Sequence, residues 1–193
     1  MIKMTIAQFV NVLPQWHAKY GDWQQGLREL TEKLEKTIPL KSNNLGYLDM
    51  NDLVDIAEWG GNQYDRKGKL QANNTNGDIR KKTREAIQYL NKDNWYSALQ
   101  SLNEIHSWGL AYSTKTLRFI RPQDYPAFDS LLRSGIKVLS LKRTAASYGQ
   151  FITLCSQIRK GAPASGPRSD HSWWLADVEM ALFAFVRDGN ELI

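Results

Sequence analysis

The chain has 193 residues, 42% of them hydrophobic, which is enough to bury a core without covalent or metal cross-links. Its 25 basic and 20 acidic residues give a net charge of +5, which favours an anionic partner without identifying one. The single cysteine, Cys155, excludes an intramolecular disulfide and a cysteine-based metal site, and no apolar stretch is long enough to cross a membrane. We therefore expect a soluble, cytoplasmic protein that binds no metal, has no membrane contact and carries Cys155 in its core.

Helical periodicity dominates the first part of the chain. One predicted helix carries four apolar residues at helical spacing, namely Trp23, Leu27, Leu30 and Leu34. Pro39 is expected to close it, because proline cannot donate a backbone hydrogen bond inside a helix. Asn51 is the expected N-cap of a short helix that carries Trp59. Residues 60–77 are polar and contain glycines and asparagines, which predicts a loop.

The second part of the chain continues the helical pattern. Predicted helices cover 78–90, a segment opened by Asp93 or Asn94, 114–120, a segment opened by Asp129, 144–159 and about 172–186. Between the last two, residues 161–172 are rich in Gly, Pro, Ser and Ala, which predicts a linker or surface loop and the one candidate domain boundary. Strand-like alternation is scarce, so the pattern predicts an all-α fold.

The most informative segment is His106–Leu132, HSWGLAYSTKTLRFIRPQDYPAFDSLL. It predicts a helix, a tight turn, a short helix, a proline-containing loop and an aspartate at a helix start. Lys115 is expected in the first turn of the helix after the hairpin, and Asp129 at the N-cap of the next helix. A two-turn helix followed by a short return loop would allow both side chains to reach one cavity.

This segment resembles the helix-hairpin-helix DNA glycosylases, in particular the 8-oxoguanine glycosylases and their small prokaryotic relatives. Residues 113–115 (Ser-Thr-Lys) match the family's lysine context, and residues 125–130 match its loop and catalytic aspartate. Residues 173–182 are similar to the closing helix of the small relatives. The resemblance covers about residues 50–187.

The resemblance implies an all-α fold of two helical lobes with the DNA site between them. Residues 1–193 would form one compact glycosylase domain, with the hairpin and catalytic region at about 95–137. Its activity would be excision of a damaged or modified base from double-stranded DNA, in repair or in defence against modified phage DNA. The expected state is a monomer without a cofactor.

The chemistry implied by the resemblance needs an amine and a carboxylate. As the base leaves, positive charge develops on the sugar, and a fixed Asp129 carboxylate would stabilise it. Lys115 would attack C1′ and form a Schiff base, which adds AP lyase activity. The alternative for Lys115 is a solvated helix residue, and for Asp129 an ordinary N-cap.

A base excised from a duplex must first be flipped out of the stack and held by side chains. The candidate pocket residues are Trp108, Tyr112, Phe128, Trp173, Trp174 and Asp177, with Trp59 as a further aromatic candidate. Core packing is the alternative for each aromatic residue, and a surface charge is the alternative for Asp177.

Contacts to the DNA backbone are expected from polar and basic residues near the hairpin and in the densest basic stretch. These are Ser113, Thr114, Arg118, Arg121, Lys81 and Lys82. A solvated face is the alternative for the two lysines. Two other functions remain open at this point: a noncatalytic helix-hairpin-helix DNA-binding module, and a helical interaction protein with no nucleic-acid role.

Overall fold

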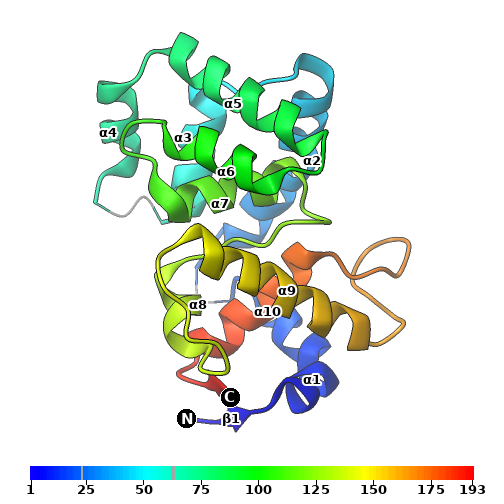
Figure 1. Ribbon diagram of the computed structural model, residues 1–193. Coiled ribbons are helices and arrows are strands. Elements are labelled where there is room, and N and C mark those ends of the chain that lie inside the picture. The colour runs from blue at the N-terminus through cyan, green and yellow to red at the C-terminus, as the bar shows by residue number, and fades with distance from the viewer. Residues whose placement is uncertain (23, 62–63) are drawn as a thin grey trace. The chain divides into compact units, whose positions relative to one another are not determined.

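The computed structural model describes residues 1–22, 24–61 and 64–193, and this part of the chain is almost entirely helical (Figure 1). Its helices are α1 (Ile6–Ala18), α2 (Leu27–Leu45), α3 (Met50–Trp59), α4 (Arg66–Asn73), α5 (Asn76–Leu90), α6 (Trp95–Asn103), α7 (Gly109–Ile120), α8 (Ser130–Gly135), α9 (Ala145–Gly161) and α10 (Leu175–Arg187). Two short strands, β1 (Lys3–Met4) and β2 (Glu191–Leu192), pair in parallel. The predicted all-α class is confirmed. Of the helices in these ranges, none combines the length and apolar character that a membrane span requires.

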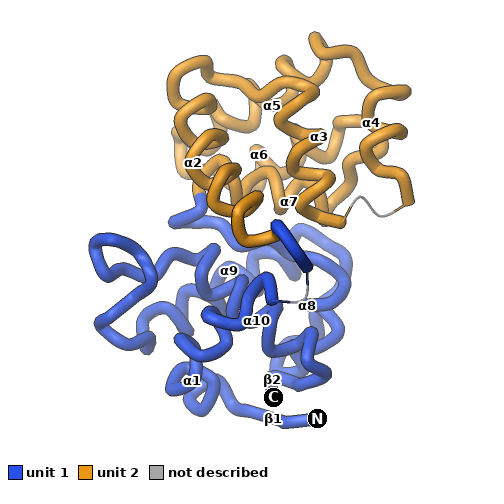
Figure 2. Tube along the Cα trace, turned by 180° about the vertical axis from the view of Figure 1, so that it is seen from behind, with its two compact units in different colours: residues 1–26, 122–193 blue, residues 27–121 orange. Residues whose placement is uncertain are grey.

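The chain divides into two compact units (Figure 2). Unit 1 contains Met1–Gly26 and Pro122–Ile193, and unit 2 contains Leu27–Arg121. The division therefore does not fall at residues 161–172, where the sequence placed its one candidate boundary. That segment is a loop inside unit 1, as its composition predicts.

Unit 1 is built around α10, which contacts α1, α8 and α9. Figure 1 shows α10 crossing this unit with α1 and α9 beside it. A helix that is apolar on all sides must be covered on all sides. The buried apolar residues of α10 are Leu175, Ala176, Val178, Met180, Ala181, Leu182, Ala184, Phe185 and Val186. The pairing of β1 with β2 joins the two ends of the chain within this unit.

Unit 2 is built around α7 and the paired helices α5 and α6. α5 lies along α6, and α7 contacts α6, α2 and α3. Its core combines buried aromatic rings with aliphatic side chains spaced for one helix face each, and the aliphatic ones include Leu34, Ile38, Leu53, Ile56, Ile79, Ala86, Leu90, Leu99, Leu102 and Leu117.

Several helix starts follow from local chemistry. Asp129 is the N-cap of α8, and its side chain accepts a hydrogen bond from the Leu132 N–H at 3.0 Å. Asn94 caps α6 in the same way, and Thr144 caps α9. All three agree with the predicted helix starts, because a short polar side chain satisfies a backbone donor that the first turn leaves open.

Two predicted caps are wrong by a few residues. Asp49, not Asn51, caps α3, and Thr75, not Asp78, caps α5. Both helices begin with a capping box, in which the cap residue and the third helical residue bond to each other's backbone N–H. In α5 the sequence prediction selected the third helical residue of that box instead of the cap.

Two predicted breaks are also wrong. Pro39 lies inside α2, where buried Ile38 and Ser42 flank it, so packing of the helix outweighs the missing backbone donor. The predicted loop at residues 60–77 contains α4, which its polar composition did not indicate. Trp23, placed on the first predicted helix, lies outside the described residues.

Candidate functional site

A tight turn connects α6 to α7, but it is shorter than the predicted turn at residues 107–113, because residues 109–113 already belong to α7. Ser107 and Gly109 both have φ of 63°, the left-handed backbone that allows this sharp change of direction. Asn74 at the end of α4 fixes the turn from the side, since its amide nitrogen donates to the His106 carbonyl and its Oδ1 accepts from the His106 N–H, each at 3.0 Å. Asn73 adds a hydrogen bond to the Ser107 hydroxyl at 3.1 Å. The hairpin is therefore held at both of its central residues.

Lys115 lies in the second turn of α7, not in the first turn as predicted. The expected helix start at Thr114 is wrong because α7 already begins at Gly109. Serine and threonine often begin helices, but here the Thr114 hydroxyl donates to the Ala111 carbonyl at 2.9 Å, a bond made inside a helix. The hairpin and Lys115 are consequently separated by about one helical turn.

The Lys115 side chain is buried among aromatic rings. Only 7% of the residue is exposed, and its Nζ lies 4.9 Å from the Tyr112 ring centre and 5.6 Å from the Trp59 ring centre. Lysine is rarely this buried, and cations lie favourably against aromatic rings at these distances. We call Trp59, Gly60, Tyr112 and Lys115 the Lys115 cluster.

Gly60 makes room for the amine. It is the C-cap of α3, and a Cβ at this position would lie 2.8 Å from Lys115 Nζ and 3.1 Å from a Tyr112 ring carbon. Any other residue would displace the amine or the ring. Nothing in the sequence marks Gly60 as a site residue, although a glycine directly after a helix is a recognised C-terminal signal.

The aromatic rings around the amine are fixed by hydrogen bonds of their own. Trp59 Nε1 donates to the Thr31 hydroxyl at 2.9 Å. Trp108 Nε1 donates to the Thr116 hydroxyl at 3.0 Å, and its ring lies 5.0 Å from that of Tyr112. Trp108 is buried, so it supports Tyr112 from inside unit 2. Of the predicted pocket residues, the structure brings Trp59, Trp108 and Tyr112 together with Lys115.

Asp129 belongs to unit 1, whereas Lys115 belongs to unit 2. Asp129 is half-buried, and one carboxylate oxygen caps α8. The preceding Phe128 is almost fully buried and stacks on Phe151 with ring centres 5.2 Å apart. Phe128 is thus a core residue, and its predicted place in a base pocket is not supported by its packing.

Asp177 has a buried carboxylate that is fully engaged within unit 1. Arg168 donates to both of its oxygens, the Trp174 N–H donates to it at 2.8 Å, and His17 Nε2 lies 3.5 Å away. Burial alone would raise the pKa of Asp177, but the hydrogen bonds from His17 and Arg168 and the Arg168 charge outweigh it and lower the pKa. These partners occupy the oxygens that were expected to read a base edge, so that prediction is wrong.

The two tryptophans before α10 hold the loop that precedes them. Trp173 Nε1 donates to the Pro163 carbonyl at 3.0 Å, and the Arg168 guanidinium lies 4.0 Å from the centre of the Trp174 ring. Pro163 and Arg168 both belong to the Gly- and Pro-rich loop. Trp173 is buried, and packing of this loop accounts for both rings without a bound base.

Three predicted contacts to the DNA backbone are contradicted by burial. Arg118 is completely buried, where it forms an ion pair of 2.6 Å with Glu35 and lies 4.3 Å from the Phe119 ring centre. Ser113 and Thr114 are also fully buried in α7. Side chains at the core of unit 2 cannot reach a phosphate outside it.

The remaining predicted backbone contacts differ in their surroundings. Lys82 bridges Glu85 and Glu104 at 3.0 and 2.5 Å, and hydrogen bonds from Glu104 and Glu85 raise its pKa. Its charge is therefore matched by acidic neighbours. Lys81 is exposed, and Arg121 is half-buried.

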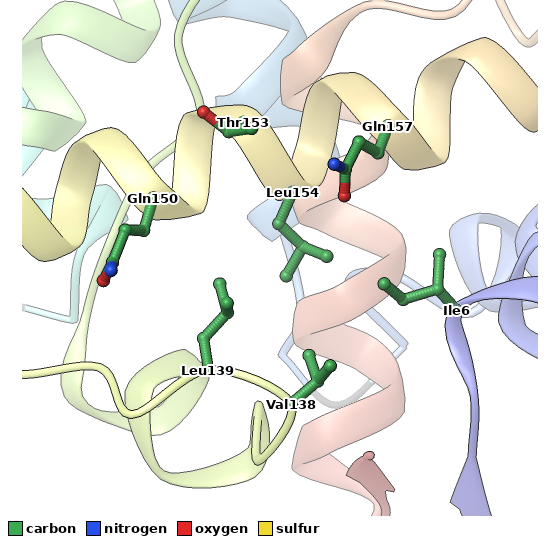
Figure 3. A pocket seen from close by; sticks show the side chains of 7 residues that line it. All are labelled: Ile6, Val138, Leu139, Gln150, Thr153, Leu154 and Gln157. Atoms are coloured by element: carbon green, nitrogen blue, oxygen red, sulfur yellow. The ribbon is translucent and has the colours of Figure 1, made fainter.

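Two surface cavities lie outside the Lys115 cluster. One, of about 260 Å³ in unit 1, lies against α9 and is lined by apolar, amide and hydroxyl side chains without an ionisable group (Figure 3). The other, of about 300 Å³ in unit 2, adjoins the hairpin and has mixed charges; it is lined by Asn73, Asn74, Asp78, Lys81, Lys82, Glu104, Ile105 and His106. Within the described ranges, no group of His, Cys, Asp and Glu has the arrangement of a metal site.

No protein-family model, curated protein or solved structure matches the chain. A function must therefore be inferred from the side chains of the chain itself, and the Lys115 cluster has the least ordinary chemistry among them.

Proposed function

We propose that this protein is a DNA glycosylase that excises a damaged or modified base, with Lys115 as its nucleophile and Asp129 as its catalytic carboxylate. The observation that carries this proposal is the Lys115 cluster, a buried amine among aromatic rings in the helix that follows a tight hairpin. Burying a lysine costs free energy, and buried ionisable groups of this kind are found preferentially at functional sites. The family resemblance over residues 106–132 supplies the reaction in which such an amine has a role.

In the proposed reaction the neutral amine of Lys115 attacks C1′ of the sugar. The N-glycosidic bond breaks, its electron pair leaves with the base, and the base takes up a proton. Loss of a proton from the new amine and opening of the sugar ring give an imine between Lys115 and C1′. The rings of Trp59 and Tyr112 restrict water around the amine, which favours attack by nitrogen over attack by water.

Asp129 supplies the negative charge that the reaction needs. Positive charge develops at C1′ as the base departs, and a carboxylate stabilises it. Asp129 provides this carboxylate from the N-cap position of α8. The bond to the Leu132 N–H holds the carboxylate in one orientation before substrate arrives.

Borohydride trapping tests the role of Lys115. Wild-type protein is incubated with duplexes that each carry a different modified base, and borohydride reduces any imine to a stable amine. We expect a covalent protein–DNA band with at least one duplex and its loss in Lys115→Gln. Lys115→Arg keeps the positive charge but cannot form the imine, so it should also lose the band. The matched control, Lys33→Gln, removes an exposed lysine paired with Asp55 and should retain it.

Asp129→Asn tests the carboxylate without removing the helix cap. Asparagine caps helices about as well as aspartate, so the fold should be retained while excision is lost. Asp188→Asn, at the exposed C-terminal end of α10, controls for the loss of one negative charge. Excision at the wild-type rate by Asp129→Asn would make Asp129 a cap only. DNA binding without excision of any base by the wild type would favour a noncatalytic DNA-binding module.

A further inference from the structure

Two arginines on the surface of unit 2 lie against one aromatic ring. The guanidinium carbons of Arg80 and Arg84 lie 5.1 and 5.2 Å from the centre of the Tyr47 ring. The arginines are one turn apart on α5, and Tyr47 belongs to the connection between α2 and α3. We call these three residues the arginine–tyrosine clamp. It lies outside the Lys115 cluster and contains none of its residues.

The position of Tyr47 is fixed by the residue that follows it. Leu48 is completely buried, and its N–H donates to the Thr83 hydroxyl of α5 at 3.0 Å. The same hydroxyl donates a hydrogen bond to the Leu48 carbonyl oxygen at 2.9 Å. Gly46 ends α2 in the left-handed conformation, with φ of 69°, and directs the chain toward α5. The ring is therefore in place to orient both guanidinium groups.

The charges of Arg80 and Arg84 are not matched by acidic side chains. Both are exposed, and within the described part of the chain neither forms an ion pair. Other cations of unit 2 differ in this respect, since Lys33 pairs with Asp55 and Lys67 with Glu58. Two like charges one turn apart weaken a helix slightly. An external anion would reduce the repulsion between two arginines that an aromatic ring holds in this way.

We propose that the arginine–tyrosine clamp binds the phosphate backbone of duplex DNA. The guanidinium group presents a planar fork of donors that matches a phosphate, and stacking on Tyr47 limits its freedom before binding. Two such groups on one ring can contact one sugar–phosphate strand. The inference rests on the proposed function, because DNA is taken as the polyanion. It assigns backbone contact to Arg80 and Arg84, which lie in the densest basic stretch of the sequence, and not to the buried Arg118.

Salt-dependent binding of a fluorescent duplex tests this contact. In Arg80→Gln/Arg84→Gln, loss of two phosphate contacts should reduce the slope of log affinity against log salt by about 1.8, which corresponds to about 60-fold weaker binding at 0.1 M salt. Lys33→Gln/Lys67→Gln removes the same number of charges from unit 2, but these are matched by acids, so its slope should stay near that of the wild type. Thermal unfolding establishes that each variant is folded.

Two substitutions at Tyr47 separate orientation from charge. Tyr47→Leu removes the ring but no charge, and it should weaken binding by a smaller factor than loss of both arginines. Tyr47→Phe keeps the ring face and should bind like the wild type. Equal binding by Tyr47→Leu and the wild type would contradict the role of the ring in the clamp.

The outcome is distinguishable from that of the catalytic proposal. If the wild type binds and excises, yet Arg80→Gln/Arg84→Gln keeps the wild-type slope, or the control loses as much, the clamp is refuted and catalysis stands. If binding depends on the clamp but no base is excised, the clamp stands and the glycosylase proposal fails. Binding of phosphatidylserine vesicles without binding of the duplex would overturn the clamp as a DNA contact.

Discussion

Replacing Asp177 with asparagine tests how strongly the loop before α10 is held. Asparagine has the same size, but it puts an NH2 group where Arg168 now meets a carboxylate oxygen. The Asp177 side chain is 1% exposed and that of Arg168 is 20% exposed. Removing one partner of a buried ion pair costs about 3–5 kcal/mol, and the partial exposure of Arg168 favours the lower end, about 3 kcal/mol. For a chain of this length we expect a Tm lower by about 6–12 °C.

Urea unfolding of Asp177→Asn at neutral and acidic pH measures this cost and its cause. Because the folded-state pKa of Asp177 is lowered, its stabilisation is present above the unfolded pKa of about 3.9 and is lost as the pH falls through the folded value. The difference between wild type and variant should therefore shrink below a pH of about 4. Asp124→Asn, in an exposed loop, should stay within about 0.5 kcal/mol of wild type. Equal stability of Asp177→Asn and wild type at pH 7, or a difference that does not change with pH, would refute the reasoning.

Two further predictions concern packing in unit 1. Gly135→Ala would bring a Cβ within 3.0 Å of Val186 in α10, so we expect the free energy of unfolding in urea to fall by about 1–3 kcal/mol. The control, Gly77→Ala in α5, meets only an ordinary contact and should not destabilise the protein. Equal stability of the two variants would contradict this prediction. Burial, together with the charge of Glu179, raises the pKa of the Cys155 thiol well above its usual value. A thiol-specific reagent should therefore label Cys155 only as the protein unfolds. Rapid labelling of the native protein would be inconsistent with the packing around this thiol.

Much of the helical layout could be predicted from the sequence because its signals are local. The caps at Asn94, Asp129 and Thr144 each satisfy a backbone donor within three residues, so they need no tertiary contact. Pro39 and the polar residues 60–77 carry local signals for a break, yet both lie where helices form. In these segments burial of one helix face determines the structure, and burial depends on residues far away in the sequence.

The candidate site shows the same limit. Tyr112 and Lys115 are three residues apart on one helix, so their proximity follows from helical geometry. The space that Gly60 leaves for the amine depends on how α3 packs against α7, which no local pattern indicates. The burial of Arg118 likewise depends on Glu35 from α2. A basic residue beside a hairpin therefore predicts a phosphate contact only when its acidic neighbours are known.

The basic residues of unit 2 have three distinct environments, and net charge does not separate them. Lys82 and Arg118 are matched by glutamates, whereas Arg80 and Arg84 share an aromatic ring on the surface and Lys115 is buried against two others. Counterion release depends on charges that meet phosphate, so the salt slope of DNA binding should respond to the arginine pair and not to Lys115. Imine formation depends on one nucleophilic amine, so borohydride trapping at saturating DNA should respond to Lys115 and not to the arginine pair. A variant of either kind that altered both measurements would show that binding and chemistry share residues, contrary to the assignment of the two roles to different side chains.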